Sequence, residues 1–464
     1  MMPIPVIAVF DVGKTNKKLF LLDEDYNIVF EKSARFIETV DEDGDVCENL
    51  ETLRSSVHDS LHEIYRMPQF DIRAINFSSY GASLVYVNEE GEPLAPLYNY
   101  LKAYPQQVKK QFYDTYGAPE QIAAETASPV LDSLNSGMQL YRIKYQKTDL
   151  FSQVKYALHL PQYLSSLVSG QAYSDITSIG CHTQLWDFVQ NDYHSWVKEE
   201  HLRKKLAPIF PSNQALAMIL NGKNCAVGIG LHDSSAALIP YLISFAEPFI
   251  LLSTGTWCIS LNPFNQQPLT AEELSSDCLS YMQYQGKPVK ASRVFSGNEH
   301  EQQVKRISAW FGQSPAHYRT MPYQAEVIAA LKEKYAPATT GTDSTGLITS
   351  GFAARDLAGF ANDVEAYHQL ILDLVDLQYS STQLVLKGTQ VKDIYVDGGF
   401  GKNEIFMNLL AQKFPDIQVW AASVAQATAV GTALAIHKSW NYKDLPNNLI
   451  QLKRYKALTH PVNI

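Results

Sequence analysis

The sequence predicts an α/β protein made of two lobes of similar construction. Strand and helix patterns alternate along all 464 residues, which is typical of this class. Each half opens with a buried strand, a polar turn containing glycine and a second strand. A chain of this length also exceeds one ordinary hydrophobic core. We place the lobes at residues 1–243 and 244–464, with the boundary in residues 239–248, where two prolines flank a short apolar stretch.

The first half contains a compact set of predicted elements. Strands are expected at residues 6–10 and 19–22, with a third beginning at 28–30. Apolar residues recur every three to four positions over residues 50–64 and predict a helix, and residues 72–77 form another strand. Three strands, a helix and a further strand make up a ribonuclease-H-like unit.

The second half repeats this opening. Strands are expected at 249–252 and 258–261, joined by the turn STGTW, and a long amphipathic helix at 363–386. A strand at 394–396 then leads into DGGFG, which is expected to open a helix with a buried stripe of Phe406, Leu409, Leu410 and Phe414. Residues 337–350 are rich in Gly, Ser and Thr, and predict a surface loop.

Composition narrows the choice of partner and location. The formal net charge is −10, which disfavours nucleic acid and anionic membranes as partners but leaves room for a small phosphorylated ligand. Five unpatterned cysteines favour reduced thiols over disulfides or a zinc site. No signal peptide is evident, and the most apolar later stretch, 236–252, is interrupted by two prolines and Glu247. We therefore expect a cytoplasmic protein; its oligomeric state is open, with a homodimer as one alternative.

The turn DVGKTNKK carries the first candidate phosphate site. Gly13 allows a tight turn in which backbone amides and the Thr15 hydroxyl point at phosphate oxygens, and Lys14 and Lys18 add positive charge. Asp11, at the end of the strand, is suited to holding Mg²⁺ through water. The alternative, an ordinary decorated hairpin, has equal weight, and a Walker A loop is excluded because Ala8 stands where its first glycine belongs.

Two further glycine turns fit phosphoryl transfer, which requires backbone donors around the transferring group. The turn STGTW places Gly255 and Thr256 after a buried strand, although a polar turn over a core tryptophan is an equal alternative. The run DGGFGKN, with Gly398, Gly399 and Asn403, lets a flat group approach the backbone near a helix N-terminus, with a purely structural turn as the alternative.

Asp233 is the candidate general base. It follows a glycine-rich strand and precedes small residues that open a helix, in GIGLHDSSA. An aspartate there can stay ionised at the floor of a cleft and accept a proton. The alternative for Asp233 is a helix N-cap, and for His232 a structural role has greater weight.

Taken in order, these motifs resemble those of the FGGY carbohydrate kinases over nearly the whole chain, and are most similar to deoxyketose kinases such as rhamnulokinase and L-fuculokinase. Further similar segments are NSGMQL at 135–140, LPQYL at 160–164 and AQATAVG at 425–431. The resemblance implies two actin/hexokinase-like lobes that close over an interlobe cleft holding ATP, Mg²⁺ and a sugar.

The resemblance also implies roles for individual residues. Asp233 would be the catalytic base and Asp11 the magnesium ligand. The phosphate-binding residues would be Gly13, Lys14, Thr15, Asn16, Lys18, Gly255 and Thr256. The adenosine-side residues would be Gly398, Gly399 and Asn403, and the sugar-binding residues Ser79, Tyr80, Gly81, Asn135, His232 and Asp233.

Departures from the family pattern fall mainly on the sugar side. The run YGAS at 80–83 stands where the family has Trp-Gly-x-Asp, and YNYLK at 98–102 stands where it has Arg and Asp. Lys14 replaces a small hydroxyl residue, and Gln426 a glutamate. Losing charged partners changes which hydroxyl pattern a pocket accepts.

These observations predict an ATP-dependent sugar phosphotransferase acting on a ketose, with L-rhamnulose or L-fuculose as the leading substrate. The alternatives are a kinase for another pentulose, hexulose or polyol, and a catalytically weak actin-like sensor that binds sugar and ATP.

Overall fold

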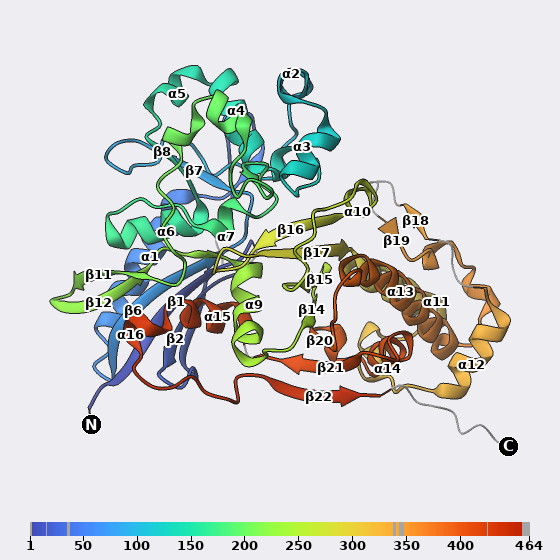
Figure 1. The fold of residues 1–464 in the computed structure, drawn as a ribbon. Helices are drawn as coiled ribbons and strands as arrows, with labels where there is room; N and C mark the ends of the chain where they lie inside the picture. Colours follow the sequence, from blue (N-terminus) through green and yellow to red (C-terminus); the bar gives the residue numbers. More distant parts are fainter. Residues whose placement is uncertain are drawn as a thin grey trace.

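The computed structural model describes residues 2–14, 16–34, 38–336, 340–342, 348–424 and 426–456. In these residues two large mixed sheets lie on either side of a pair of packed helices (Figure 1). The strands of one sheet all precede residue 243, and those of the other all follow it.

The first sheet has the strand order β11-β12-β6-β1-β2-β3, with β13 also paired to β6. β1 is antiparallel to β2 and parallel to β6, so the ribonuclease-H-like opening is confirmed. Its strands are β1 (Ile4–Val12), β2 (Lys17–Asp23), β3 (Ile28–Ala34), β6 (Phe70–Ser79), β11 (Ala215–Leu220), β12 (Lys223–Gly228) and β13 (Leu231–His232).

The second sheet repeats this arrangement, with the order β16-β17-β15-β14-β20-β21-β22. Here β14 takes the place of β1, since it is antiparallel to β15 and parallel to β20. The predicted repeat is therefore confirmed. Its strands are β14 (Phe249–Thr254), β15 (Cys258–Asn262), β16 (Cys278–Met282), β17 (Pro288–Val294), β20 (Asp393–Gly398), β21 (Gln418–Ser423) and β22 (Gln451–Tyr455).

Helices cover the outer faces of both sheets. α1 (Leu50–Tyr65) agrees with the predicted helix and is capped by the Asn49 side chain. α13 (Asp363–Leu386) agrees with its prediction at both ends and is capped by Asn362. The second lobe also contains α10 (Ala271–Ser275), α11 (Ser296–Phe311), α12 (Ala325–Lys334), α14 (Glu404–Lys413) and short 3₁₀ helices at Pro315–Thr320 and Phe400–Lys402.

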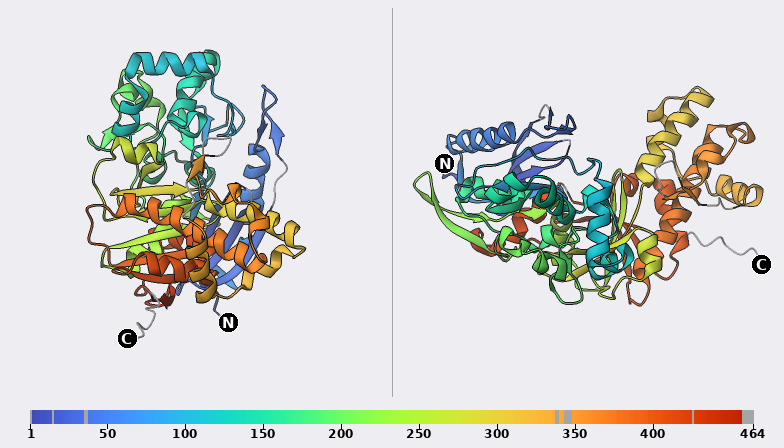
Figure 2. Two further views of the ribbon diagram at one scale, coloured as in Figure 1. Left: turned by 90° about the vertical axis from the view of Figure 1, so that its right-hand side faces the viewer. Right: turned by 90° about the horizontal axis from the view of Figure 1, so that it is seen from above.

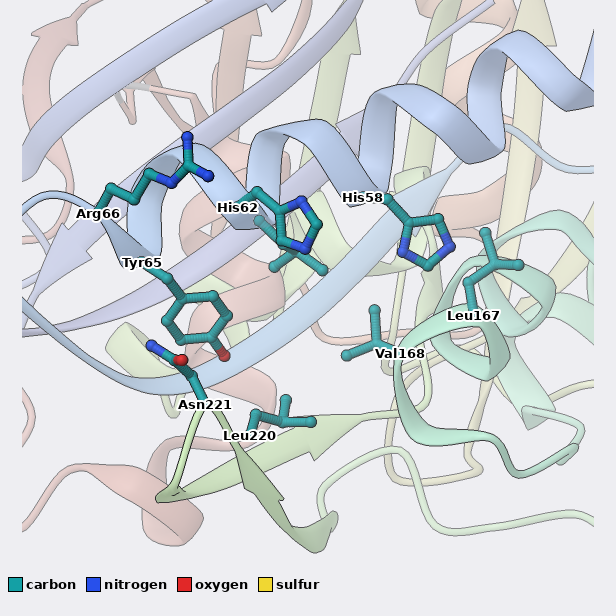
Figure 3. A pocket seen from close by; sticks show the side chains of 9 residues that line it. His58, His62, Tyr65, Arg66, Leu167, Val168, Leu220 and Asn221 are labelled. Atoms are coloured by element: carbon teal, nitrogen blue, oxygen red, sulfur yellow. The ribbon is translucent and has the colours of Figure 1, made fainter.

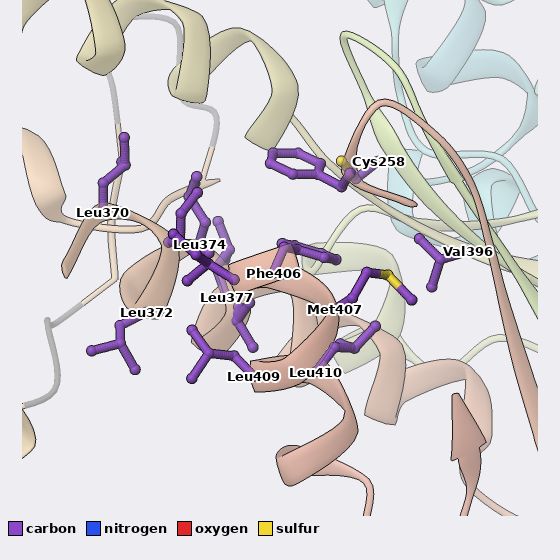
Figure 4. Close-up of a cluster of buried hydrophobic side chains, with 14 of the residues drawn as sticks. Cys258, Leu370, Leu372, Leu374, Leu377, Val396, Phe406, Met407, Leu409 and Leu410 are labelled. Atoms are coloured by element: carbon purple, nitrogen blue, oxygen red, sulfur yellow. The ribbon is translucent and has the colours of Figure 1, made fainter. Parts of the chain in front are cut away.

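The helix expected directly at DGGFG begins later than predicted. Gly398 has a φ of 92°, which is a left-handed conformation. The regular helix α14 starts only after Asn403, whose side chain accepts a hydrogen bond from the Phe406 amide. The buried stripe of α14 is confirmed, and it packs with α13 into the core shown in Figure 4. In the predicted surface loop 337–350, β18 (Gly341–Thr342) pairs with β19 (Ile348–Thr349), and the other positions of the loop up to residue 347, apart from Thr340, lie outside the described residues.

A small helical region, which the sequence patterns did not predict, stands above the first sheet in Figure 1 and in the left view of Figure 2. It has its own aromatic core, which includes Phe112, Tyr141 and Trp196. Its elements are β7 (Leu84–Val87), α2 (Gln106–Tyr116), α3 (Pro119–Glu125), α4 (Ser136–Gln146), α5 (Thr148–Gln153), β8 (Tyr156–His159), α7 (Ile176–Ile179) and α8 (Ser195–Glu199). The helix α6 (Leu160–Ser169) packs instead on β6 and β12 of the first sheet.

Two helices, α9 (Asp233–Ser244) and α15 (Ala427–Ala435), lie side by side between the sheets (Figure 1). They approach so closely that a Cβ at Gly431 would lie 1.8 Å from the Ala236 carbonyl oxygen. α15 also packs on β1 and β2, and α16 (His437–Trp440) contacts β6 and β12. The division at residues 243 and 244 stays a prediction, because this late segment packs back against the first sheet.

Across the described ranges, no helix has both the length and the apolar character needed to cross a membrane.

Candidate active site

The first hairpin turn follows Asp11, which lies near the end of β1. The Gly13 amide donates to the Asn16 carbonyl oxygen at 2.9 Å and closes the turn between β1 and β2. Asp11 accepts a hydrogen bond from Ser78 Oγ at 3.0 Å, because these residues are register partners on β1 and β6. Thr15, predicted to bind phosphate, lies outside the described residues.

Asp233 lies at the end of β13 and is the first residue of α9. Burial raises the pKa of its carboxyl group to about 6, partly offset by hydrogen bonds from the Ser234 amide and hydroxyl. About 35% of the side chain is still exposed, so the carboxylate can meet a ligand. His232, and not Asp233, occupies the N-cap position, so the N-cap alternative for Asp233 is wrong.

Asp11 and Asp233 lie on either side of β6, because Asp11 is the register partner of Ser78 and His232, directly before Asp233, is that of Ser79. Burial, and after it the negative charge of Asp233, raises the pKa of Asp11 to about 6, while Ser78 and Lys18 oppose this shift. A divalent cation would relieve this repulsion. The described residues contain no cluster of three or more His, Cys, Asp or Glu side chains that could hold a metal by themselves. One carboxylate together with phosphates and water nevertheless suits Mg²⁺.

His232 lies directly behind Asp233. Its Nε2 is 3.4 Å from Asp233 Oδ1 and 3.2 Å from Cys181 Sγ, and its ring stacks on Tyr281. Burial lowers the pKa of His232 to about 4, so the ring is neutral at pH 7. A Cβ at Gly81 would lie only 2.9 Å from His232 Nε2, which is the physical reason for glycine at this position.

A group of charged and aromatic side chains forms the adjoining wall. Lys14 Nζ lies 3.5 Å from Glu48 Oε1 and over the rings of Tyr80 and Tyr100. The Tyr80 hydroxyl donates to Glu48 Oε1 at 2.7 Å. Glu48 was missed by sequence reasoning, because no local pattern marks a carboxylate that is buried only by residues distant in the chain.

Two predicted sugar ligands use their side chains elsewhere. Ser79 is buried and its hydroxyl donates to the Tyr80 carbonyl oxygen. Asn135 is fully buried, donates to the His182 carbonyl oxygen at 2.8 Å and accepts from the Leu131 amide at 2.7 Å. Direct contact of either residue with a sugar stays a prediction.

The second hairpin turn and the glycine turn DGGFG lie together. The Gly399 amide donates a hydrogen bond to the Thr254 carbonyl oxygen at 2.9 Å. The Thr254 hydroxyl accepts a hydrogen bond from the Phe400 amide at 3.1 Å. A Cβ at Gly398 would lie 1.9 Å from the Thr254 carbonyl oxygen, so only glycine fits. The structure thus brings together the STGTW and DGGFG motifs.

These two turns form one end of a cavity of about 770 Å³, a size typical of small-ligand sites. Asn403 lines it, and its Nδ2 donates to the Tyr367 hydroxyl at 2.8 Å. Residues from α11 and the 3₁₀ helix Pro315–Thr320 complete the walls, and sequence reasoning missed them because their spacing is that of ordinary amphipathic segments. The predicted and newly found lining residues include Gly255, Thr256, Gly399, Asn298, His300, Lys305, Tyr318, Arg319, Tyr367 and Lys402.

A second cavity, of about 380 Å³, lies on the outer surface between α1, α6 and the β11–β12 turn (Figure 3). His58 and His62 of α1 and Arg66, its C-cap residue, line it, and no predicted site residue contributes to it.

Both halves of the chain match models of known protein families. Residues 6–239 match the model "FGGY family of carbohydrate kinases, N-terminal domain", and residues 246–444 match "Carbohydrate kinase FGGY, C-terminal domain". The chain is 21% identical over 184 residues to a rhamnulokinase of Halalkalibacterium halodurans, a match that spans 38% of this chain and only 39% of that relative.

Solved structures with the same fold cover almost the whole chain. A carbohydrate kinase from Novosphingobium aromaticivorans superposes with a TM-score of 0.79 at 24% identity, covering 98% of this chain and 95% of that one. A ligand-bound xylulose kinase from Lactobacillus acidophilus superposes with a TM-score of 0.78 at 16% identity, covering 98% and 94%.

Proposed function

Since both family models match, the chain belongs to the FGGY family of carbohydrate kinases, and we propose that it transfers the γ-phosphoryl group of ATP to a hydroxyl group of a ketose. The observation that carries this proposal is the partly exposed Asp233 carboxylate beside Asp11, with the nucleotide-sized cavity bounded by the second hairpin.

Asp233 acts as the general base in this proposal. A carboxyl group with a pKa of about 6 is largely ionised at neutral pH, yet is basic enough to accept the proton of the attacking hydroxyl as the O–P bond forms. The phosphoryl group then leaves ADP, and Asp233 holds the proton until product release.

The nucleotide occupies the second lobe. Gly399 and Asn403 lie beside the adenosine within the cavity, and Gly398 shapes the turn that holds them. Gly13, Asn16 and Lys18 from the first hairpin and Gly255 and Thr256 from the second hold the phosphates with backbone amides, a hydroxyl and a cation. Mg²⁺ would be held by Asp11 and the phosphates, and it would neutralise charge on the transferring group.

The leading acceptors are L-rhamnulose and L-fuculose, supported by the similarity to a rhamnulokinase over part of the chain. His232 and Gly81 border the base and would contact the bound sugar. Another pentulose, hexulose or polyol is the alternative acceptor. We also propose that the enzyme is cytoplasmic and that its two lobes consist of residues 1–243 and 244–464.

Replacing Asp233 with Asn tests the base. We expect ADP release in the presence of a ketose panel to fall by about 10³-fold or more, with binding of ATP and Mg²⁺ retained. Sustained turnover in D233N would mean that another group removes the proton. If no sugar stimulates the wild-type protein although ATP binds, the sensor alternative replaces the kinase proposal.

A further inference from the structure

We propose that Lys14, although it stands on the phosphate hairpin, binds the acceptor sugar and determines its specificity. This inference rests on the proposed kinase function and names the part of the site that selects a polyhydroxylated substrate.

The Lys14 side chain lies on the acceptor side of the hairpin. Its Nζ is 5.7 Å from the ring centroids of both Tyr80 and Tyr100, and 3.5 Å from Glu48 Oε1. Burial, followed by the negative charge of Asp233, raises the pKa of Tyr100. Tyr80 directly precedes Gly81, which packs against His232 Nε2. That nitrogen is 3.4 Å from Asp233 Oδ1, so Lys14 rests on the segment that borders the base.

The Glu48 carboxylate has several charged and polar partners. Lys17 Nζ lies 3.0 Å from Glu48 Oε2, and the Tyr80 hydroxyl donates to Oε1. One carboxylate thus faces two ammonium groups. Lys17 is buried, whereas 28% of the Lys14 side chain is exposed, so the donors open to a ligand are those of Lys14.

Lys18 provides a natural comparison on the same hairpin. Its Nζ pairs with Glu31 at 2.9 Å, and its register partner on β1 is Asp11, the proposed magnesium ligand. Lys14 lies in the turn beyond these paired strands, and its Nζ points to Glu48 instead. The hairpin therefore presents Lys18 to the metal and phosphates and Lys14 to the acceptor.

Ion pairs anchor the segment that carries Tyr100. Lys102, two residues after Tyr100, is buried among Asp41, Asp43 and Asp45 at 2.5, 2.8 and 2.8 Å. An ammonium group resting on preorganised aromatic rings loses little freedom when it donates to sugar hydroxyls. Lys14 thereby supplies a charged donor in a pocket that lacks the arginine and aspartate of the family pattern.

Substitution of Lys14 distinguishes a role in binding the acceptor sugar from a role in binding the ATP phosphates. K14M removes the charge with little change in length, K14R keeps it, and K14T restores a small hydroxyl side chain. We would measure KM for ATP and for L-rhamnulose, L-fuculose and D-xylulose. K14M and K14T should raise the acceptor KM about tenfold with the ATP KM within about twofold, and K14R should recover most of the loss.

The matched variant is K18M, which should raise the ATP KM and leave the acceptor KM unchanged. If K14M instead raises the ATP KM and spares the acceptor KM, Lys14 is a phosphate ligand and the proposal is overturned.

Failure of the kinase proposal gives a different result. If the wild-type protein phosphorylates none of the three sugars, the ketose assignment fails, while calorimetry with ATP and Mg²⁺ still decides the place of Lys14. Unchanged nucleotide affinity in K14M then supports the acceptor side, and a tenfold loss overturns it.

Discussion

The carboxyl groups of Asp11 and Asp233, which come from different ends of the first lobe's sequence, lie close enough that the charge of Asp233 raises the pKa of Asp11. Each has a pKa of about 6. The site therefore concentrates negative charge where a metal and a proton are to be handled.

The first prediction concerns the pH dependence of activity. Asp233 must be ionised to accept a proton, so kcat/KM should fall as pH decreases through about 6 and be level above about 7. Steady-state rates from pH 5 to 8.5 at saturating Mg²⁺ check this expectation. A profile that is flat through pH 6 would mean that Asp233 is not the group whose ionisation limits the rate.

The second prediction concerns stability. A folded-state pKa of about 6, against 3.8 for an unperturbed aspartate, means that the folded protein binds the proton more tightly, so stability decreases as pH rises from about 4 to 6. D233N, which is neutral, should be more stable than wild type at pH 8 by on the order of 1 kcal/mol, allowing for partial exposure. Urea unfolding at pH 8 and pH 4.5 measures the difference, which should shrink at the lower pH.

The third prediction concerns Gly81. In G81A the added methyl group would displace the His232 ring, which cannot retreat easily because it is buried against Tyr281. Since His232 precedes Asp233, kcat should fall by about tenfold or more while ATP binding is retained. An unchanged kcat, with a normal unfolding transition, would show that the ring moves without disturbing the base.

The fourth prediction separates two roles of Asn403. Its Oδ1 caps α14, and its Nδ2 donates to the Tyr367 hydroxyl at the cavity wall. N403A should lose about 1 kcal/mol of stability and raise the ATP KM, whereas N403S should keep the cap and lose only the contact with Tyr367. Equal stability losses in both variants would contradict this division. The acceptor KM should be unchanged in either.

The fifth prediction concerns the contact between α9 and α15. A methyl group in G431A would collide with the Ala236 carbonyl oxygen, so the helices must separate at a cost of about 3 kcal/mol. Because Asp233 begins α9, kcat should fall as well. A427S, on the half-buried first turn of α15, is the control and should change stability by less than about 1 kcal/mol.

The sequence predicted those parts of the molecule that local patterns determine. The bounds of α13 follow from its apolar stripe and from Asn362 as its cap, and both glycine hairpins follow buried strands. The helix α14 begins later than the sequence predicted, because Gly398 in a left-handed conformation and the capping residue Asn403 lie between the strand and the helix.

The remaining features depend on contacts between distant segments. Glu48 joins Lys14 and Tyr80 only after folding, and Tyr367 meets Asn403 across the cavity from another helix. Periodicity shows which side of a helix is buried, and it contains no information on which distant residue covers that side.

The packing of α15 against β1 and β2 also constrains the order of events during protein synthesis. Ile7, Val9 and Phe20 share one core with Ala429 and Ala433, so the inner face of the first sheet is not fully covered until residues 427–440 have left the ribosome. An exposed apolar sheet is a target for aggregation and for chaperones. The first part of the chain to be made is thus among the last to become fully folded.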